Sequence, residues 1–429
     1  MVLYKELFPE GVDDIHSDEY ELKEDLVADI RTMFKSYGYR QVGTPTFEFY
    51  DLYSGIDGTI DVTEMFKIID SDGKILVLRP DATIPVARMA AMNYRHSDGY
   101  LKLSYITNIF RHNESERGNR REFTQAGIEY MGSSKTWCDA EVIAIGIKML
   151  LGFGLKDFHI DMGHAGFLGQ LLEGSGLDGQ KTEILCKFIE DKNYSELSLY
   201  LGRLKIDENV KNAIIKLPRL YGKPSEVIER AEDVILNEEM RNSLEDIKAV
   251  YNMLKMQGME KYIHFDLGFT NQFNYYTGVI YKGYVSNYGR VLLAGGRYDK
   301  LMEQFGEGKP ACGFGFNVDQ LIEAMNIYDI NQAYDCHTDF HIVFSDANMV
   351  SAQALAESMR RKGMIVETDI FQNDLQFQIF NAGFRNAEHM VEFIGDEIMV
   401  RRMTDRAVKT YSVKNIAKLI NEPAEIKKF

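Results

Sequence analysis

Residues 101–131 read LKLSYITNIFRHNESERGNRREFTQAGIEYM, and this stretch decides the fold. Its two ends, 101–110 and 122–131, are rich in β-branched and aromatic residues, which favour strands. The segment that connects them, HNESERGNRR, is polar and contains glycine, as a surface loop requires. The sequence therefore predicts a long hairpin within an antiparallel sheet.

The segments around the hairpin extend this pattern to an α+β core. Residues 17–38 carry apolar side chains at helical spacing, with Ser17 as a cap and Gly38 as a stop. A second helix is expected over residues 138–153. Further strands are expected at 75–79, 262–267, 275–285 and 290–294. Together these elements predict a core on an antiparallel sheet that occupies residues 1–330.

Two changes of pattern divide the chain further. Between about 165 and 258, Leu, Ile and charged residues recur at helical spacing with few strand signals, which predicts a helical module inserted in the core. A second change lies near 330–338, after which strand-like and helix-like segments alternate. Residues 336–429 are therefore expected to form a small C-terminal α/β domain.

Composition limits the function classes. The chain has 429 residues and a formal net charge of −16 at pH 7, which disfavours general binding to phosphate backbones. Its four cysteines show no CxxC spacing, so free thiols in a reducing compartment are expected. We see no signal-peptide pattern and no apolar run of membrane-spanning length. These features predict a cytoplasmic protein with no membrane partner.

Within the hairpin, FRHNESERGNRREFTQAGIEY at 110–130 resembles motif 2 of the class II aminoacyl-tRNA synthetases, and most of all their histidyl branch. Four more stretches resemble that branch in the same order: PEGVDDIHSDEY at 9–20, TEMFKIIDSDGKILVLRPDATIPVAR at 63–88, NYYTGVIYKGYV at 274–285 and LAGGRYDKLMEQFG at 293–306. The chain thus resembles the histidyl-tRNA synthetase family over nearly its whole length. The resemblance implies a class II synthetase-like core, with residues 336–429 similar to the family's anticodon-binding domain.

The resemblance also implies a pocket for free histidine. The family's pocket residues map onto Asp81, Thr83, Gln125, Glu129, Tyr275 and Tyr276. By this mapping Asp81, Thr83 and Gln125 hold the ammonium group, while Glu129 and Tyr276 bracket the imidazole. The residue types suit the ligand, because an ammonium needs a carboxylate and neutral acceptors and an imidazole needs polar partners at both nitrogens. Asp81 is one methylene shorter than the family's usual Glu.

Activation of histidine by ATP, in contrast, is expected to be lost. That reaction needs cations where negative charge develops on the α-phosphate. The leading arginine of motif 2 is present as Arg111, but Gln320 and Asn271 stand where the family has two further arginines. In addition, Asn113 replaces a motif 2 glutamate. No catalytic residue is therefore expected.

The partner of the histidine carboxylate stays open at this point. Arg111, Arg121 or Asn271 could take that place. Arg121 and Arg297 are also the arginines that could replace the lost cations, and Tyr298 is a further candidate beside Arg297 in the signature LAGGRYDK.

A chain that keeps the pocket and loses the chemistry is expected to be a regulator. The family includes a non-catalytic relative that regulates the short-form ATP phosphoribosyltransferase of histidine biosynthesis. This role implies a catalytic subunit as partner, self-association as a homodimer, feedback by free histidine, and no cofactor. The alternatives are an active histidine–tRNA ligase and a paralogue for another amino acid.

Neither tRNA nor a metal ion is expected as a partner. Residues 336–429 carry 12 basic and 13 acidic residues, which disfavours tRNA. A strand over FHIVFS would separate His337, His341 and Cys336, so no metal site is expected there.

Overall fold

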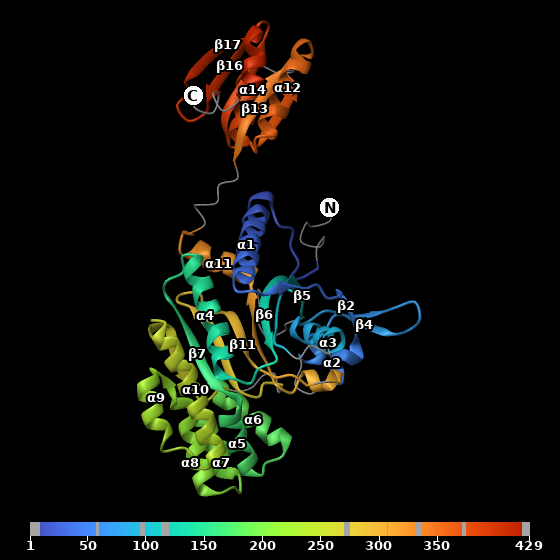
Figure 1. Cartoon of the computed structure of the whole chain (residues 1–429). Coiled ribbons are helices and arrows are strands. Elements are labelled where there is room, and N and C mark those ends of the chain that lie inside the picture. Colours follow the sequence, from blue (N-terminus) through green and yellow to red (C-terminus); the bar gives the residue numbers. More distant parts are fainter. Residues whose placement is uncertain are drawn as a thin grey trace, which may run out of the picture. The chain divides into compact units, whose positions relative to one another are not determined.

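The predicted hairpin is present in the computed structural model as β5 (Leu101–Phe110) and β6 (Glu122–Met131). Antiparallel pairing runs from Leu101 opposite Met131 to Phe110 opposite Glu122. The structure describes residues 9–56, 60–94, 99–112, 120–269, 275–306, 308–330, 337–370 and 375–422. The chain divides into two compact units, Met1–Asn331 and Gln332–Phe429 (Figure 1). This division falls within the interval 330–338 where the sequence pattern changes.

The hairpin belongs to a nine-stranded sheet that forms the centre of the first unit. The order of its strands is β1-β5-β6-β12-β11-β10-β7-β9-β8. Only β1 with β5 and β7 with β9 pair in parallel, so the described sheet is mainly antiparallel. The remaining strands are β1 (Arg40–Gln41), β7 (Phe158–His164), β8 (Tyr221–Gly222), β9 (Ile263–Asp266), β10 (Val279–Val285), β11 (Val291–Arg297) and β12 (Ala311–Asn317).

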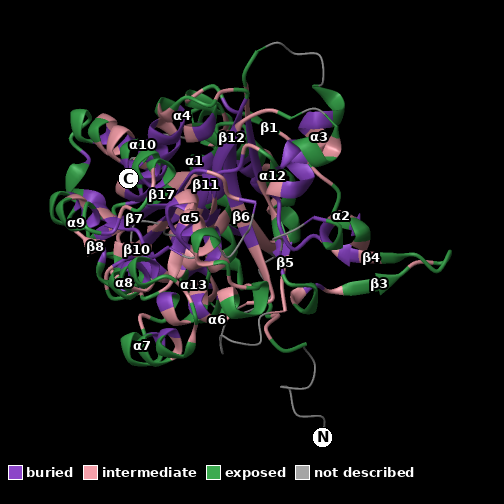
Figure 2. Ribbon diagram, turned by 90° about the horizontal axis from the view of Figure 1, so that it is seen from below, coloured by how far each residue is buried: buried purple, intermediate pink, exposed green. Residues whose placement is uncertain are grey.

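Helices cover one face of this sheet. Contacts join α1 (Ser17–Ser36) to β5 and β6, α4 (Thr136–Gly152) to β6, β11 and β12, and α11 (Val318–Ile327) to β6 (Figure 1). Buried residues follow the central strands β6, β11 and β12 (Figure 2). A small sheet of β2 (Phe47–Phe49), β4 (Ile75–Leu78) and β3 (Lys67–Ile69) accompanies α2 (Tyr50–Ser54) and α3 (Thr83–Asn93). Within the described residues, no helix has the length and apolarity needed to cross a membrane.

A helical module interrupts the sheet between β7 and β9. It consists of α5 (Ala165–Ser175), α6 (Gly179–Glu190), α7 (Tyr194–Arg203), α8 (Glu208–Lys216), α9 (Pro224–Ala231) and α10 (Glu238–Met256). The long helix α10 joins the module to the core through contacts with α4, α5 and β7. The bounds follow the sequence expectation of about 165–258, and the module also contributes the short edge strand β8.

The second unit is a small α/β domain with its own core. Its sheet has the order β14-β13-β15-β16-β17, parallel around β13 and antiparallel from β15 onwards. The strands are β13 (Thr338–Phe344), β14 (Val366–Ile370), β15 (Ala387–Ile394), β16 (Glu397–Arg402) and β17 (Val408–Ser412). The helices are α12 (Met349–Arg360), α13 (Leu375–Phe384) and α14 (Ile416–Asn421).

Some elements were not predicted from the sequence, namely β7, β12, α3 and α13. The segment of β12, ACGFGFN, has two glycines, which lower its strand signal. The segment of β7, FHIDMGH, alternates apolar with polar or small residues, so the signal for this strand was present in the sequence. The predicted strand over 275–285 begins instead at Val279, because Tyr275 lies in a turn and Tyr276 follows it outside the sheet.

Candidate functional site

A cavity lies on the face of the sheet opposite α1. Phe314 of β12 packs against Phe34 of α1, so its neighbours Gly313 and Gly315 face the other side. The cavity is small, with a volume of about 90 Å³. Its described lining consists of Asp81, Thr83, Tyr105, Arg111, Gln125, Glu129, Tyr275, Tyr276, Ala294, Gly295, Tyr298, Gly313, Phe314 and Gly315.

Strand β6 supplies two polar side chains to the floor. Gln125 and Glu129 share one face with Gly127 because side chains alternate along a strand. The hydroxyl of Tyr105, on β5, donates to Gln125 Oε1 at 3.3 Å. Gly313 pairs with Glu129 across the sheet, and a Cβ there would lie 1.8 Å from Glu129 Oε2. The glycines of β12 therefore make the room that the two polar side chains occupy.

Glu129 is the most perturbed carboxyl group of the cavity. It is 1% exposed, and its Oε2 accepts a hydrogen bond from the Tyr298 hydroxyl. The second oxygen, Oε1, is buried and has no hydrogen-bond partner among the described residues. Burial raises the pKa of Glu129 to about 8, and the neighbouring hydroxyls of Tyr298 and Thr83 offset only part of this rise. The group can therefore hold a proton near neutral pH and exchange it with a ligand.

Asp81 provides the second buried carboxyl group, at the start of α3. Its Oδ2 accepts the backbone N–H of Ile84 at 3.0 Å, which fixes the side chain against the helix N-terminus. Burial raises the pKa of the Asp81 carboxyl, while nearby Arg111 acts in the opposite direction. Thr83, the first residue of α3, also lines the cavity.

Arg111 follows directly after β5 and is the only cationic side chain among the described residues that line the cavity. Its Nε donates to the carbonyl of Pro80 at 2.7 Å, and its guanidinium lies 6.0 Å from the ring centroid of Phe123. These contacts hold a positive charge at the cavity wall, on the same side as Asp81.

Three tyrosines complete the wall. The ring centroids of Tyr275 and Tyr276 lie 4.7 Å apart, and Tyr275 meets Tyr298 edge to face at 5.9 Å. Tyr298, which follows β11, also donates to Glu129. Burial raises the pKa of each of these phenols, so they act as neutral hydrogen-bonding groups.

The structure brings seven predicted pocket residues and Tyr298 together but places two other candidates elsewhere. Arg297 does not line the cavity, because its guanidinium is held by the buried Asp139, with Nη2 2.6 Å from Oδ2, and by Asp299. Arg121 also lies outside the lining and pairs with Glu10 at 3.1 Å. In this structure both arginines form ion pairs outside the described lining of the cavity. Their nearness in sequence to cavity residues, together with the resemblance, had suggested them.

Of the three positions that differ from a synthetase able to activate histidine with ATP, the structure describes only Gln320. Gln320 lies in the first turn of α11, where its backbone N–H donates to the cap residue Asn317, and it does not line the cavity. Asn271 and Asn113 lie outside the described residues.

Sequence reasoning missed Tyr105 and the glycines of β11 and β12. The signal for Tyr105 was present, because strand alternation and hairpin register place it opposite Gly127, between Gln125 and Glu129. The glycines carried no comparable signal, since their role depends on which strand lies next to β6.

Comparison of the sequence with known proteins shows which family the chain belongs to. The sequence model described as histidyl-tRNA synthetase matches residues 11–321. A protein of Acetivibrio thermocellus named ATP phosphoribosyltransferase regulatory subunit is 34% identical over 419 residues, or 97% of this chain and 100% of that protein. The chain belongs to this family of regulatory subunits. The prediction of a non-catalytic subunit of a glycosyltransferase complex is thereby confirmed.

Solved structures bear out the fold of this regulatory subunit. One from Bacillus halodurans, described as an ATP phosphoribosyltransferase regulatory subunit/histidyl-tRNA synthetase, is 30% identical with a TM-score of 0.79, covering 90% of this chain and 98% of that one. A histidyl-tRNA synthetase from a Nostoc species is 19% identical with a TM-score of 0.76, covering 97% and 99%. The predicted α+β, class II synthetase-like fold is confirmed.

Proposed function

We propose that this regulatory subunit binds free histidine in the cavity and conveys feedback inhibition to an ATP phosphoribosyltransferase catalytic subunit with which it assembles. One observation carries the proposal. Two buried carboxyl groups, Glu129 and Asp81, share a small cavity with a single described lining cation, Arg111. A zwitterionic amino acid whose side chain has N–H groups matches that charge pattern, and histidine is such an amino acid.

The orphan oxygen of Glu129 gives the proposed binding mode its orientation. An imidazole N–H donated to Oε1 would give this buried oxygen the partner it lacks among the described residues. The ammonium group then lies at Asp81 and Gln125, and the carboxylate at Arg111. With Arg121 and Arg297 held in ion pairs, Arg111 is the carboxylate partner we favour.

Feedback requires more than binding. Histidine shifts the activity of the assembly only if it binds its active and inactive forms with different affinity. We propose that the subunit forms a homodimer that assembles with the catalytic subunits, and that tRNA is not a partner.

Calorimetry of the purified chain against each of the twenty amino acids tests the ligand. We expect one site that prefers histidine, and an absence of histidine binding would overturn the proposal. Mixing the chain with a short-form catalytic subunit then tests the regulation. The mixture should gain phosphoribosyltransferase activity that histidine inhibits, and the inhibition should be weaker in a Glu129→Gln variant.

An active histidine–tRNA ligase is the alternative to exclude, because its fold is shared. Histidine-dependent exchange of pyrophosphate into ATP measures that activity directly. We expect no exchange above the rate without protein, since Gln320 provides no positive charge for the α-phosphate. Robust exchange would refute the regulatory reading of the cavity.

A further inference from the structure

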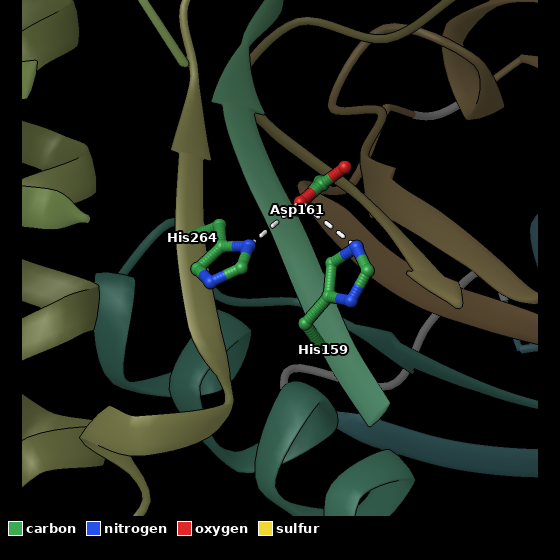
Figure 3. Close-up of side chains that lie close together, drawn as sticks. All are labelled: His159, Asp161 and His264. Carbon is green, nitrogen blue, oxygen red and sulfur yellow. Dashed lines mark ion pairs between the residues drawn. The ribbon is translucent and has the colours of Figure 1, made fainter. Parts of the chain in front are cut away.

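A second polar cluster lies on the sheet away from the cavity, where the helical module leaves and rejoins the core. His159 and Asp161 share one face of β7, and His264 stands next to Asp161 on the parallel strand β9. His159 Nε2 lies 3.6 Å from Asp161 Oδ1, and His264 Nδ1 lies 3.7 Å from the same oxygen. Figure 3 shows both rings turning a nitrogen toward the carboxylate.

These distances suit ligands of one ion better than hydrogen bonds. Nitrogen and oxygen in a hydrogen bond lie about 2.7–3.2 Å apart, and both separations exceed that range. Two ligands of a tetrahedral Zn²⁺, each about 2.0–2.2 Å from the metal, lie roughly 3.3–3.6 Å from each other. The donor atoms of all three residues lie within 4.8 Å of one another, so the three groups converge on one place.

The cluster also contains buried polar atoms without partners. Asp161 is 7% exposed, and neither its Oδ1 nor His264 Nδ1 has a hydrogen-bond partner among the described residues. Leaving such groups unpaired costs about 1–3 kcal/mol each, so their convergence calls for an occupant. The imidazoles are about one-third exposed, with side-chain exposures of 29% and 33%, which gives an ion access.

Aromatic neighbours hold the proposed ligands in place. Tyr284 stacks on His159 with ring centroids 5.5 Å apart, and Tyr221 meets His264 edge to face at 5.9 Å. The Tyr221 hydroxyl also interacts with the Asp161 carboxylate. Outer partners of this kind orient metal ligands in known sites.

The nearby charges leave Asp161 without a close cation. Lys282 stands opposite Asp161 on β10, but its ammonium lies 3.9 Å from Glu190 and over the ring of Phe269. The other neighbouring carboxylate, Asp266, pairs with Lys192 at 3.2 Å. Lys282 weakens a cation site without occupying it.

We propose that His159, Asp161 and His264 bind a divalent transition-metal ion, with Zn²⁺ as the best match for two imidazoles and one carboxylate. Two ligands precede the helical module and the third follows it. The ion therefore ties the strand that enters the module to the strand that leaves it, and its fourth position is left for water or another ligand. The sequence shows no ligand spacing because the whole module separates the donors.

Zinc titration of tag-free, chelator-treated full-length protein tests the site, with a competing indicator dye as the readout and Co²⁺ absorption as a second probe. His264→Gln should weaken binding at least about 10-fold, since loss of even an outer partner costs that much. Lys282→Met should tighten it, because a nearby positive charge is removed. Added Zn²⁺ should also raise the melting temperature of the wild type but not of His264→Gln.

His337→Gln is the matched control, because His337, Asp339 and Glu388 form a second group of suitable donors in the C-terminal unit. That variant should retain the site. The proposal is overturned if the wild type binds no Zn²⁺, or if His264→Gln binds it as tightly as the wild type. Loss of binding in His337→Gln alone would also overturn it. If His264→Gln does not fold, Asp161→Asn provides a second test of the site, because it keeps the shape of the side chain. It should also weaken Zn²⁺ binding.

Discussion

Replacing Glu129 with Gln changes the group on which the proposed histidine site depends. The substitution keeps the shape of the side chain and an acceptor for Tyr298, but it removes the charge and the exchangeable proton. A hydrogen bond to a charged partner contributes about 1.5–3 kcal/mol. At pH 7 the variant should therefore bind histidine roughly 10- to 150-fold more weakly, at about 1.4 kcal/mol for each factor of ten.

The pH dependence gives a sharper signature than the affinity alone. With a pKa of about 8, Glu129 in the empty protein is protonated at pH 7 and ionised at pH 9. If one proton is shared between Glu129 and the imidazole in the complex, binding above that pKa must take a proton up. Histidine affinity should then fall about tenfold between pH 7 and pH 9. Below about pH 6.5 the free imidazole carries a second proton that binding must release, so affinity also falls there.

Calorimetry in buffers of different ionisation enthalpy measures both the histidine affinity and the number of protons taken up on binding. The wild type should take up almost no proton on binding at pH 7, and at pH 9 about one proton more than the Glu129→Gln variant. The Glu129→Gln variant should lack the additional loss at high pH. Titration of the ligand's own ammonium group affects both proteins and cancels in their ratio. Glu226→Gln, an exposed substitution on α9, serves as the matched control. Equal affinity of Glu129→Gln and wild type at pH 7, or the same high-pH loss in both, would refute the reasoning.

Three further substitutions, together with one control, separate binding from packing. Arg297→Met should lower the free energy of unfolding by about 3–5 kcal/mol in urea, because it leaves the buried Asp139 without its partner, while the folded protein still binds histidine. Gly313→Ala should cost about 1–3 kcal/mol and weaken histidine binding, because its Cβ would lie 1.8 Å from a carboxylate oxygen of the cavity floor. Gly174→Ala, with nothing within 4 Å, should cost no stability. Arg111→Met should weaken histidine about 10-fold or more in calorimetry but leave histamine, which lacks a carboxylate, nearly unchanged; an equal loss for both ligands would contradict a carboxylate contact.

Much of the core followed from local sequence signals. The hairpin of β5 and β6 was predictable because its strands are long and its loop is polar, and the positions of Gln125 and Glu129 followed from alternation. Strand β12 was not predictable from the sequence, because its glycines lower strand propensity. Its pairing with β6 joins segments far apart in the chain, which no local pattern indicates. The order of the sheet, and with it the cavity floor, had to come from the structure.

The ion pair of Arg297 shows what residue type alone does not indicate. An arginine beside a pocket signature is a reasonable partner for a carboxylate, and Arg297 does bind one. That carboxylate is Asp139, on α4 and far away in sequence, so no local pattern could indicate it. Arg111 differs because its Nε donates to the carbonyl of Pro80 in the cavity wall rather than to a carboxylate.

Three buried carboxyl groups of the core distinguish stability from function. Asp139 receives hydrogen bonds from Nε and Nη2 of Arg297, and removing either partner would destabilise the fold. The ion pair therefore accounts for the burial of the Asp139 carboxylate. Glu129 and Asp161 each keep one buried carboxylate oxygen without a hydrogen-bond partner among the described residues. An unpaired buried oxygen destabilises the folded protein, and no contact that the structure describes compensates for it. Both converge with other polar groups, Glu129 on a cavity with Arg111 and Asp161 on two imidazoles. The same physical criterion therefore selects the proposed histidine site and the proposed metal site, and sets both apart from the ion pair.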